Sequence, residues 1–222
     1  MTFVPFSPFS VTPAAPALGL AGAVANRPGA PRPLLRLPDA GLLAGTLVET
    51  ETGWQPVETL AIGQRVHTFD GGLQPLVALA RQRIAPGAGL VEVPGGVLST
   101  CSTLRLLPGQ HLLVETGAAA ERLDCDRALV PASALEGWNG VNVVRPRLGT
   151  DVIALSFEAE EAVYAQTGVL MHCPAAGTPA AQAPRSDFFT VLDRSAARAL
   201  FGLNAPEPGG AAVGIPGVRR AA

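Results

Sequence analysis

The chain has 222 residues, of which 48% are hydrophobic but only 5% aromatic, so any core must be built mainly from Leu, Val, Ile and Ala. Its 16 Lys and Arg against 18 Asp and Glu give a net charge of −2, which excludes the basic excess typical of nucleic-acid-binding proteins. No apolar run approaches the roughly 20 residues of a membrane-spanning helix, and no basic segment precedes the first apolar residues as in a secretory signal, so we expect no membrane association.

Both ends of the chain have the composition of flexible segments. Residues 1–38 contain eight prolines among many Ala and Gly residues, and residues 205–222 have the same character. Frequent proline prevents helix formation and central-strand pairing, which predicts a disordered leader at 1–38 and a disordered tail at 205–222. The sequence therefore predicts one folded domain at 39–175, followed by a Pro/Ala-rich linker and a terminal helix at 176–204.

The folded region is a series of short Val- and Leu-rich segments separated by turn residues. The first three lie at 46–50, 54–57 and 65–69, with turns at Thr52-Gly53 and Asp70-Gly71-Gly72. Further strands are expected at 76–84, 90–93, 97–98, 104–107, 111–115, 130–135 (entering a short helical turn), 141–144, 152–157, 162–165 and 169–171. Strands this short and frequent are typical of a barrel or sandwich-like module, so the predicted fold class is mainly β.

One segment near the end has helical rather than strand periodicity. Between Ser186 and Phe201, apolar residues recur near helical spacing, and Gly202 follows as a stop signal. Ser186 or Asp187 is expected to cap this helix at its N-terminus.

The opening segments also carry a family resemblance. Gly45-Thr46, a strand, a turn, then Val57-Glu58 and Leu60, Gly63 and Val66 at fixed spacing, closed by Asp70-Gly71-Gly72, resemble the start of Hint domains. This fold is shared by hedgehog autoprocessing domains and inteins, and the chain is more narrowly similar to short bacterial Hint-domain proteins. The resemblance covers about residues 40–175. It implies a compact β module of the kind that ordinarily cuts its own chain.

The position of the family's nucleophile is occupied by Gly41. The resemblance implies a cysteine four residues before the glycine of Gly45-Thr46, and here that residue is glycine. Self-cleavage begins when a side-chain sulfur or oxygen attacks the preceding carbonyl. Glycine has no side chain, so we expect this step to be lost.

His111 is the best candidate for a remaining catalytic group. It follows Gln110 at the start of an apolar strand, which resembles the family's central histidine block. In active members this histidine polarises the scissile amide and protonates its leaving nitrogen, with a Thr or Ser three residues earlier assisting. Here that position is Pro108, which has neither a hydroxyl nor an N–H. The missing partner favours the alternative, that His111 only forms a hydrogen bond within the fold.

His172 and Cys173 resemble the end of an intein, where a histidine precedes the asparagine that cyclises. No asparagine follows His172. Either Cys173 replaces it, or the asparagine is deleted and Cys173 is the downstream nucleophile; neither arrangement supports cyclisation. The alternative is a buried small cysteine beside a histidine at a strand end.

The other candidates are weaker. Glu160 stands where the bacterial relatives tend to carry a histidine, and a turn with solvated carboxylates at Glu160-Glu161 is expected. The chain has three cysteines, Cys101, Cys125 and Cys173. They form no CxxC pair and no zinc-binding spacing, and their odd number argues against a disulfide framework. We therefore predict no metal ion, no cofactor and a reducing, cytoplasmic setting, with secretion by a non-classical route left open.

Three functional hypotheses follow. The first is a Hint domain that has lost self-cleavage. The second is residual self-cleavage that uses Cys173 or a hydroxyl such as that of Thr46. The third, compatible with the first, is a non-catalytic binding module whose flexible tails contact other proteins. The sequence favours the first and third over an enzyme, and the resemblance to Hint domains implies that Gly41, His111 and His172 lie close together.

Overall fold

A computed structural model describes residue 38, residues 40–178, residue 184 and residues 186–203, and the structural statements below refer to these residues. The predicted leader and tail lie almost wholly outside them. None of the described helices is long and apolar enough to cross a membrane.

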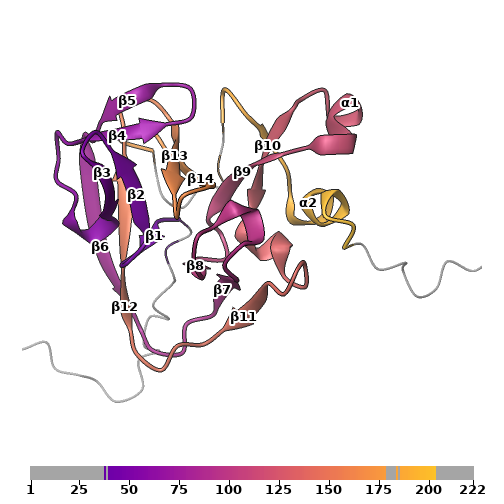
Figure 1. Cartoon of the computed structure of the whole chain (residues 1–222), viewed down its shortest axis with the longest axis horizontal. Coiled ribbons are helices and arrows are strands. Elements are labelled where there is room, and N and C mark those ends of the chain that lie inside the picture. Colours follow the sequence, from indigo (N-terminus) through magenta and orange to yellow (C-terminus); the bar gives the residue numbers. More distant parts are fainter. Residues whose placement is uncertain (1–37, 39, 179–183, 185, 204–222) are drawn as a thin grey trace, which may run out of the picture. The chain divides into compact units, whose positions relative to one another are not determined.

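Fifteen short strands of the described chain form two sheets, which confirms the mainly β prediction (Figure 1). The six-stranded sheet has the order β11 (Asn142–Val144), β7 (Leu90–Val93), β8 (Leu104–Leu106), β1 (Leu42–Leu43), β12 (Thr150–Ser156) and β6 (Ala78–Ile84). The nine-stranded sheet has the order β15 (Thr190–Val191), β10 (Arg127–Pro131), β9 (His111–Glu115), β14 (Val169–Cys173), β13 (Glu161–Ala165), β2 (Leu47–Thr50), β4 (Arg65–Thr68) and β5 (Gly72–Pro75), with β3 (Gly53–Pro56) paired to β2.

The opening meander forms as the sequence predicts. Strand β2 alternates between half-buried and buried positions, with Val48 and Thr50 facing the interior. The Thr50 hydroxyl donates to the Gly53 carbonyl at 2.7 Å and closes the turn to β3, where Gly53 has a φ of 105°. This φ is one that glycine adopts without steric cost, so the Thr-Gly signal specifies the turn.

The core consists of aliphatic residues, as the low aromatic content requires. Leu42 and Leu106 from the six-stranded sheet, and Leu112 and Met171 from the nine-stranded sheet, belong to one buried cluster. Phe157 is the largest fully buried side chain. Each buried methylene contributes about 0.8 kcal/mol, so a Leu/Val core of this extent holds the two sheets together without aromatic packing.

Two sequence predictions were wrong about local structure. The strand expected at 97–98 is a short 3-10 turn, η2 (Val97–Ser99), with Leu98 at a φ of 53°, and β7 pairs with β8 across this loop. The helix expected from residue 186 begins eight residues later, as α2 (Arg194–Leu200). The Asp193 side chain caps it by accepting from the Ala196 N–H at 2.8 Å, so neither Ser186 nor Asp187 does.

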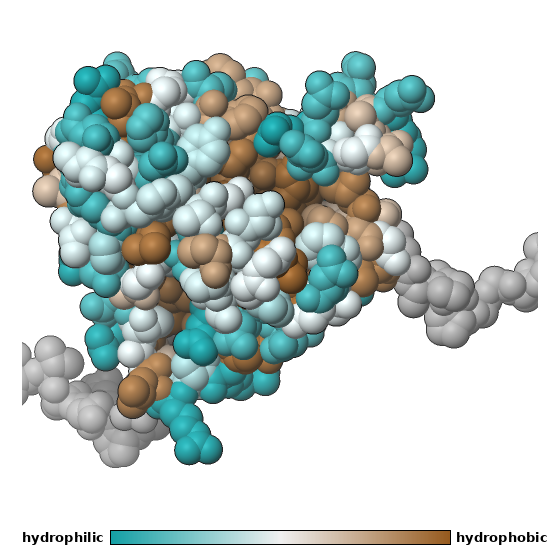
Figure 2. Space-filling model, viewed as in Figure 1, coloured by the Kyte–Doolittle hydropathy of each residue, from teal (hydrophilic) through white to brown (hydrophobic). Residues whose placement is uncertain are grey.

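The remaining elements are short turns, and the last helix is fixed by one of them. They are η1 (Val57–Thr59), η3 (Gly117–Ala119), α1 (Ala120–Leu123) and η4 (Ala132–Leu135). Helix α2 lies on η4, and Arg198 donates to the carbonyl of Glu136 at 2.9 Å. Apolar residues gather below α1 in the region of β9 and α2 (Figure 2). A hollow of about 540 Å³ is lined there by residues of η2, β9, β14 and α2.

Candidate functional site

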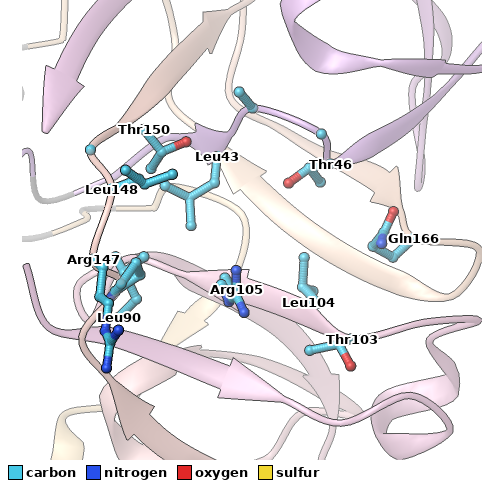
Figure 3. A pocket seen from close by; sticks show the side chains of 14 residues that line it. Leu43, Thr46, Leu90, Thr103, Leu104, Arg105, Arg147, Leu148, Thr150 and Gln166 are labelled. Carbon is cyan, nitrogen blue, oxygen red and sulfur yellow. The ribbon is translucent and has the colours of Figure 1, made fainter. Parts of the chain in front are cut away.

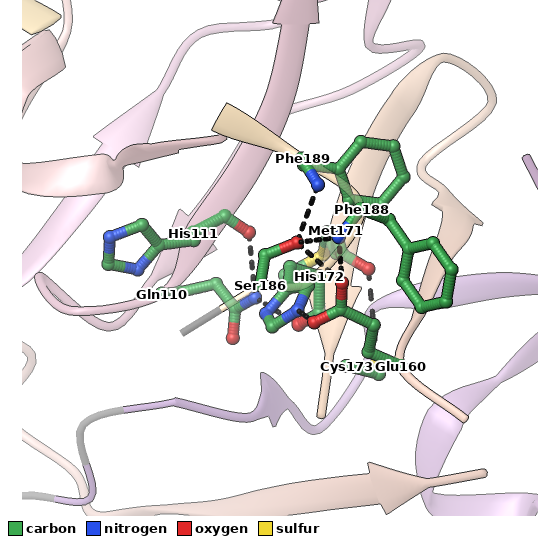
Figure 4. A network of polar contacts seen from close by, with 9 residues as sticks. All are labelled: Gln110, His111, Glu160, Met171, His172, Cys173, Ser186, Phe188 and Phe189. Carbon is green, nitrogen blue, oxygen red and sulfur yellow. Dashed lines mark hydrogen bonds and ion pairs between the residues drawn. The ribbon is translucent and has the colours of Figure 1, made fainter. Parts of the chain in front are cut away.

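The backbones of Gly41, His111 and His172 meet at one side chain, the amide of Gln110. The Gly41 N–H donates to Gln110 Oε1 at 2.8 Å. Gln110 Nε2 donates to the carbonyls of His111 and His172, both at 2.9 Å (Figure 4). Gln110 is only 1% exposed, so these hydrogen bonds are made without competition from water. The three residues therefore lie together, as the sequence predicts, while their catalytic roles stay a prediction.

Position 41 has a backbone that favours glycine. Gly41 has a φ of 137°, which residues with a Cβ rarely adopt. A Cβ built at this position would lie 2.5 Å from Val152 Cγ1, well inside van der Waals contact. Val152 is held in place because it pairs with Leu43 across β1 and β12. In this backbone conformation, position 41 thus has no room for a side chain.

His111 is a buried, neutral imidazole. Its Nδ1 lies 2.8 Å from the Gly109 carbonyl, which can only accept, so Nδ1 carries the proton and Nε2 is left as an acceptor. Burial lowers the pKa of His111 to about 4, with the nearby His172 a smaller cause. At neutral pH His111 therefore has no proton to give from Nε2. Pro108, three residues earlier, only offers its carbonyl, which accepts from Ser133 N–H at 2.9 Å.

His172 is paired with Glu160. Its Nε2 lies 3.4 Å from Glu160 Oε2, and burial lowers the pKa of His172 while Glu160 acts in the opposite direction. The other oxygen of Glu160 accepts from the Ser186 hydroxyl and from the Phe188 N–H (Figure 4). The Glu160 side chain is 9% exposed, so the solvated turn predicted here was wrong. A histidine partner and two donors compensate for burying this carboxylate.

Cys173 is a buried thiol. It is 2% exposed, and its Sγ lies 3.8 Å from the Met171 carbonyl. Burial raises the pKa of Cys173 to about 12, with the negative charge of Glu161 as the second cause. Glu161 itself is a buried residue of β13, opposite Cys173, and its Oε2 has no hydrogen-bond partner among the described residues. The expected solvated carboxylate at 161 was therefore wrong as well.

The comparisons with known proteins decide the family. A family model of the Hint domain matches residues 40–170, more than half of the chain. This chain belongs to the Hint domain family. No curated protein matches the chain.

Solved structures with some likeness to this Hint domain are inteins and an intein-like domain. The bacterial intein-like domain of Clostridium thermocellum is 13% identical, with a TM-score of 0.45, over 60% of this chain and 98% of that domain. The AceL NrdHF class 3 split intein is 14% identical, with a TM-score of 0.43, over 61% and 98%. The MchDnaB-1 intein is 18% identical, with a TM-score of 0.38, over 59% and 98%.

Sequence reasoning missed three residues of this Hint site. Gln110 was read only as part of the motif that contains His111, although its side chain joins the three backbones. Glu160 and Ser186 form the pair that connects β13 to the segment before β15. A carboxylate at a position where relatives tend to carry histidine was the available signal for a partner of His172.

Proposed function

We propose that this Hint domain is a stable module that neither cuts nor splices its own chain. The observation that carries this proposal is the geometry at Gly41: a φ of 137° and a neighbouring Val152 methyl where a Cβ would lie. A nucleophilic side chain is missing, and the space it would need is filled. If the nucleophile had been lost by substitution alone, the space for its side chain would still be open.

The substitute nucleophiles considered from sequence have poor surroundings for the reaction. The Cys173 thiol is buried and its pKa is raised to about 12, so its thiolate is scarce at neutral pH. Thr46 is 4% exposed, and its hydroxyl has no hydrogen bond to a base among the described residues. A hydroxyl needs such a base to become a nucleophile.

The site then has a structural role in the proposed module. Gln110 ties the first residues of the domain to the closing strand β14, and Glu160 ties β13 to the chain before β15. A fold whose two ends are fixed in this way suits a binding module. Contact with other proteins through the terminal segments, and a cytoplasmic location, belong to this proposal.

The test is the intact mass of the purified full-length protein. We expect a single species of 22.7 kDa that is unchanged after incubation with a thiol or with hydroxylamine. The matched variants Cys173→Ala and His111→Ala should give the same result after correction for the substitution. A fragment that ends near residue 40 or residue 172 in the wild type, and is absent from either variant, would move the protein into the self-cleaving class.

A further inference from the structure

A cavity of about 710 Å³ opens beside β1, in the six-stranded sheet (Figure 3). Five parts of the chain line it: Leu43–Thr46, Leu90, Thr103–Arg105, Pro146–Thr150 and Gln166. Its volume lies within the roughly 300–1,000 Å³ typical of small-molecule sites. None of the residues that surround Gln110 lines it, so the cavity is separate from the site described above.

The cavity combines apolar surface with polar groups. Leu43, Leu90 and Leu104 are each 5% exposed or less and form the apolar part of the lining. Leu148, which is 81% exposed, adds an apolar side chain at its edge. Leu43, Leu90 and Leu104 leave little surface free, so the hydrocarbon body of a ligand would contact mainly Leu148 and remove its surface from water.

All charged residues of the lining are arginines. Arg105 uses its Nε to contact Glu92 Oε2 at 2.8 Å, which leaves its two terminal nitrogens for other partners. Arg147 is exposed and has no ion pair or hydrogen bond through its side chain within the described part of the chain. A guanidinium with free N–H groups binds a carboxylate through two parallel hydrogen bonds.

A threonine hydroxyl also points into this space. Thr46 is 4% exposed, and its Oγ1 makes no hydrogen bond to the described residues. Figure 3 shows this hydroxyl directed toward the interior of the cavity, with Thr150 on the far side. A hydroxyl that faces a cavity without a protein partner is free to donate to or accept from water or a ligand. Thr46 therefore marks the cavity as polar at the end nearest β2.

We propose that this cavity binds an amphipathic carboxylic acid, with the carboxylate on Arg147 and Arg105 and an aliphatic body against Leu148 and the exposed edge of Leu43. The same chemistry is presented by a free medium-chain acid and by a peptide C-terminus that ends in an apolar residue. The site needs none of the residues of the lost self-cleavage reaction. It stands whether or not the chain cuts itself.

The experiment is calorimetric titration of the full-length protein at low salt with matched acid and neutral probes. Octanoate is compared with octanamide, and N-acetyl-Ala-Leu with its C-terminal amide. We expect at least one acid to bind and its neutral partner to bind about tenfold more weakly, because the charge-assisted hydrogen bonds are lost. Octanoate binding assigns the site to free acids, and binding of the peptide acid alone assigns it to a chain terminus.

Substitutions at the cavity decide whether the bound probe is where we place it. Arg147→Gln should weaken binding of the acid about tenfold, and Thr46→Val should weaken it several-fold. Arg122→Gln is the matched control, because Arg122 is an exposed residue of α1 and the charge change is the same. Absence of binding by both acids, or equal affinity in the wild type and Arg147→Gln, would overturn the proposal. Arg147 is exposed, so its replacement leaves folding intact.

Discussion

The site around Gln110 includes Gly41, and the cavity beside β1 includes Leu43, only two residues later. The two places differ in whether their polar groups have hydrogen-bond partners. At Gln110 the polar groups are buried and paired: Gly41, His111 and His172 all bond to one amide. In the cavity, Arg147 and the Thr46 hydroxyl have no partner within the described residues. Groups that are fully paired stabilise a fold, whereas unpaired groups at an open surface are available to a ligand. The comparison fits the proposed function, in which the site around Gln110 stabilises the fold.

The largest effect should come from Gln110→Leu. The change removes three buried hydrogen bonds, one from the Gly41 N–H and two to the carbonyls of His111 and His172, so we expect the free energy of unfolding to fall by about 3–5 kcal/mol. Denaturant titration measures it. Gln82→Leu, at an exposed position of β6, is the control and should change stability by less than about 0.5 kcal/mol. A small loss at Gln110 would mean that the site is not structural.

The second effect is on the pH dependence of stability. The pKa of His111 is about 4 in the folded protein against 6.5 for the free side chain, so the unfolded chain binds more protons between these values. Stability should therefore fall as pH drops from about 7 to 4, by up to about 3 kcal/mol from this histidine. His111→Asn should flatten the curve. Identical slopes in wild type and His111→Asn would contradict the assignment.

The third effect tests whether position 41 is closed. Gly41→Ala places a Cβ against Val152 at an unfavourable φ, and we expect a loss of about 2 kcal/mol or more in denaturant titration. Gly45→Ala is the matched control, since Gly45 also has a positive φ, of 89°, but a Cβ there meets nothing within 4 Å. It should cost only about 1 kcal/mol. Equal losses of stability in the two variants would show that Val152 moves away from the new Cβ and that position 41 is not closed.

The same position predicts the outcome of restoring the nucleophile. The side chain introduced by Gly41→Cys meets the same clash with Val152. We therefore expect at most slow, thiol-dependent cleavage before residue 41, and the intact mass of the purified variant measures it. Gly41→Cys with Pro108→Thr should cleave faster, because catalytic groups act as a unit. Fast cleavage by the single variant would show that the site is still prepared for chemistry.

The smallest effect should come from Ser186→Ala. The hydroxyl donates to Glu160 and accepts from the Phe189 N–H at 2.6 Å, so its loss should lower stability by about 1 kcal/mol. Ser133→Ala is the control, because the Ser133 side chain forms no hydrogen bond within the described part of the chain. Thermal melts of the two variants measure this difference. A lower melting temperature for Ser133→Ala than for Ser186→Ala would contradict the prediction.

The strands could be predicted from sequence because their signals are local. Alternating burial and turn residues such as Thr52-Gly53 specify the meander within a few residues of chain. The true start of α2 could not be predicted. The Ser186 hydroxyl accepts from the Phe189 N–H, as a helix cap would, but it also donates to Glu160, 26 residues away, and no helix follows it until Arg194. The φ of Gly41 and its contact with Val152 depend on strand register. A glycine at the nucleophile position shows that the group is missing, but not that its space is filled.

The pairing of β15 with β10 has a consequence for any break in the chain near residue 173. Strand β15 runs parallel to β10, and the Leu192 N–H donates to the Leu129 carbonyl at 2.9 Å. Together with α2 on η4, these contacts would retain the downstream piece after a cut, as a two-piece complex of native size. Gel filtration would see one particle, and only denaturing separation would reveal two. Equally, the segments before and after such a break, produced separately, should assemble by complementation.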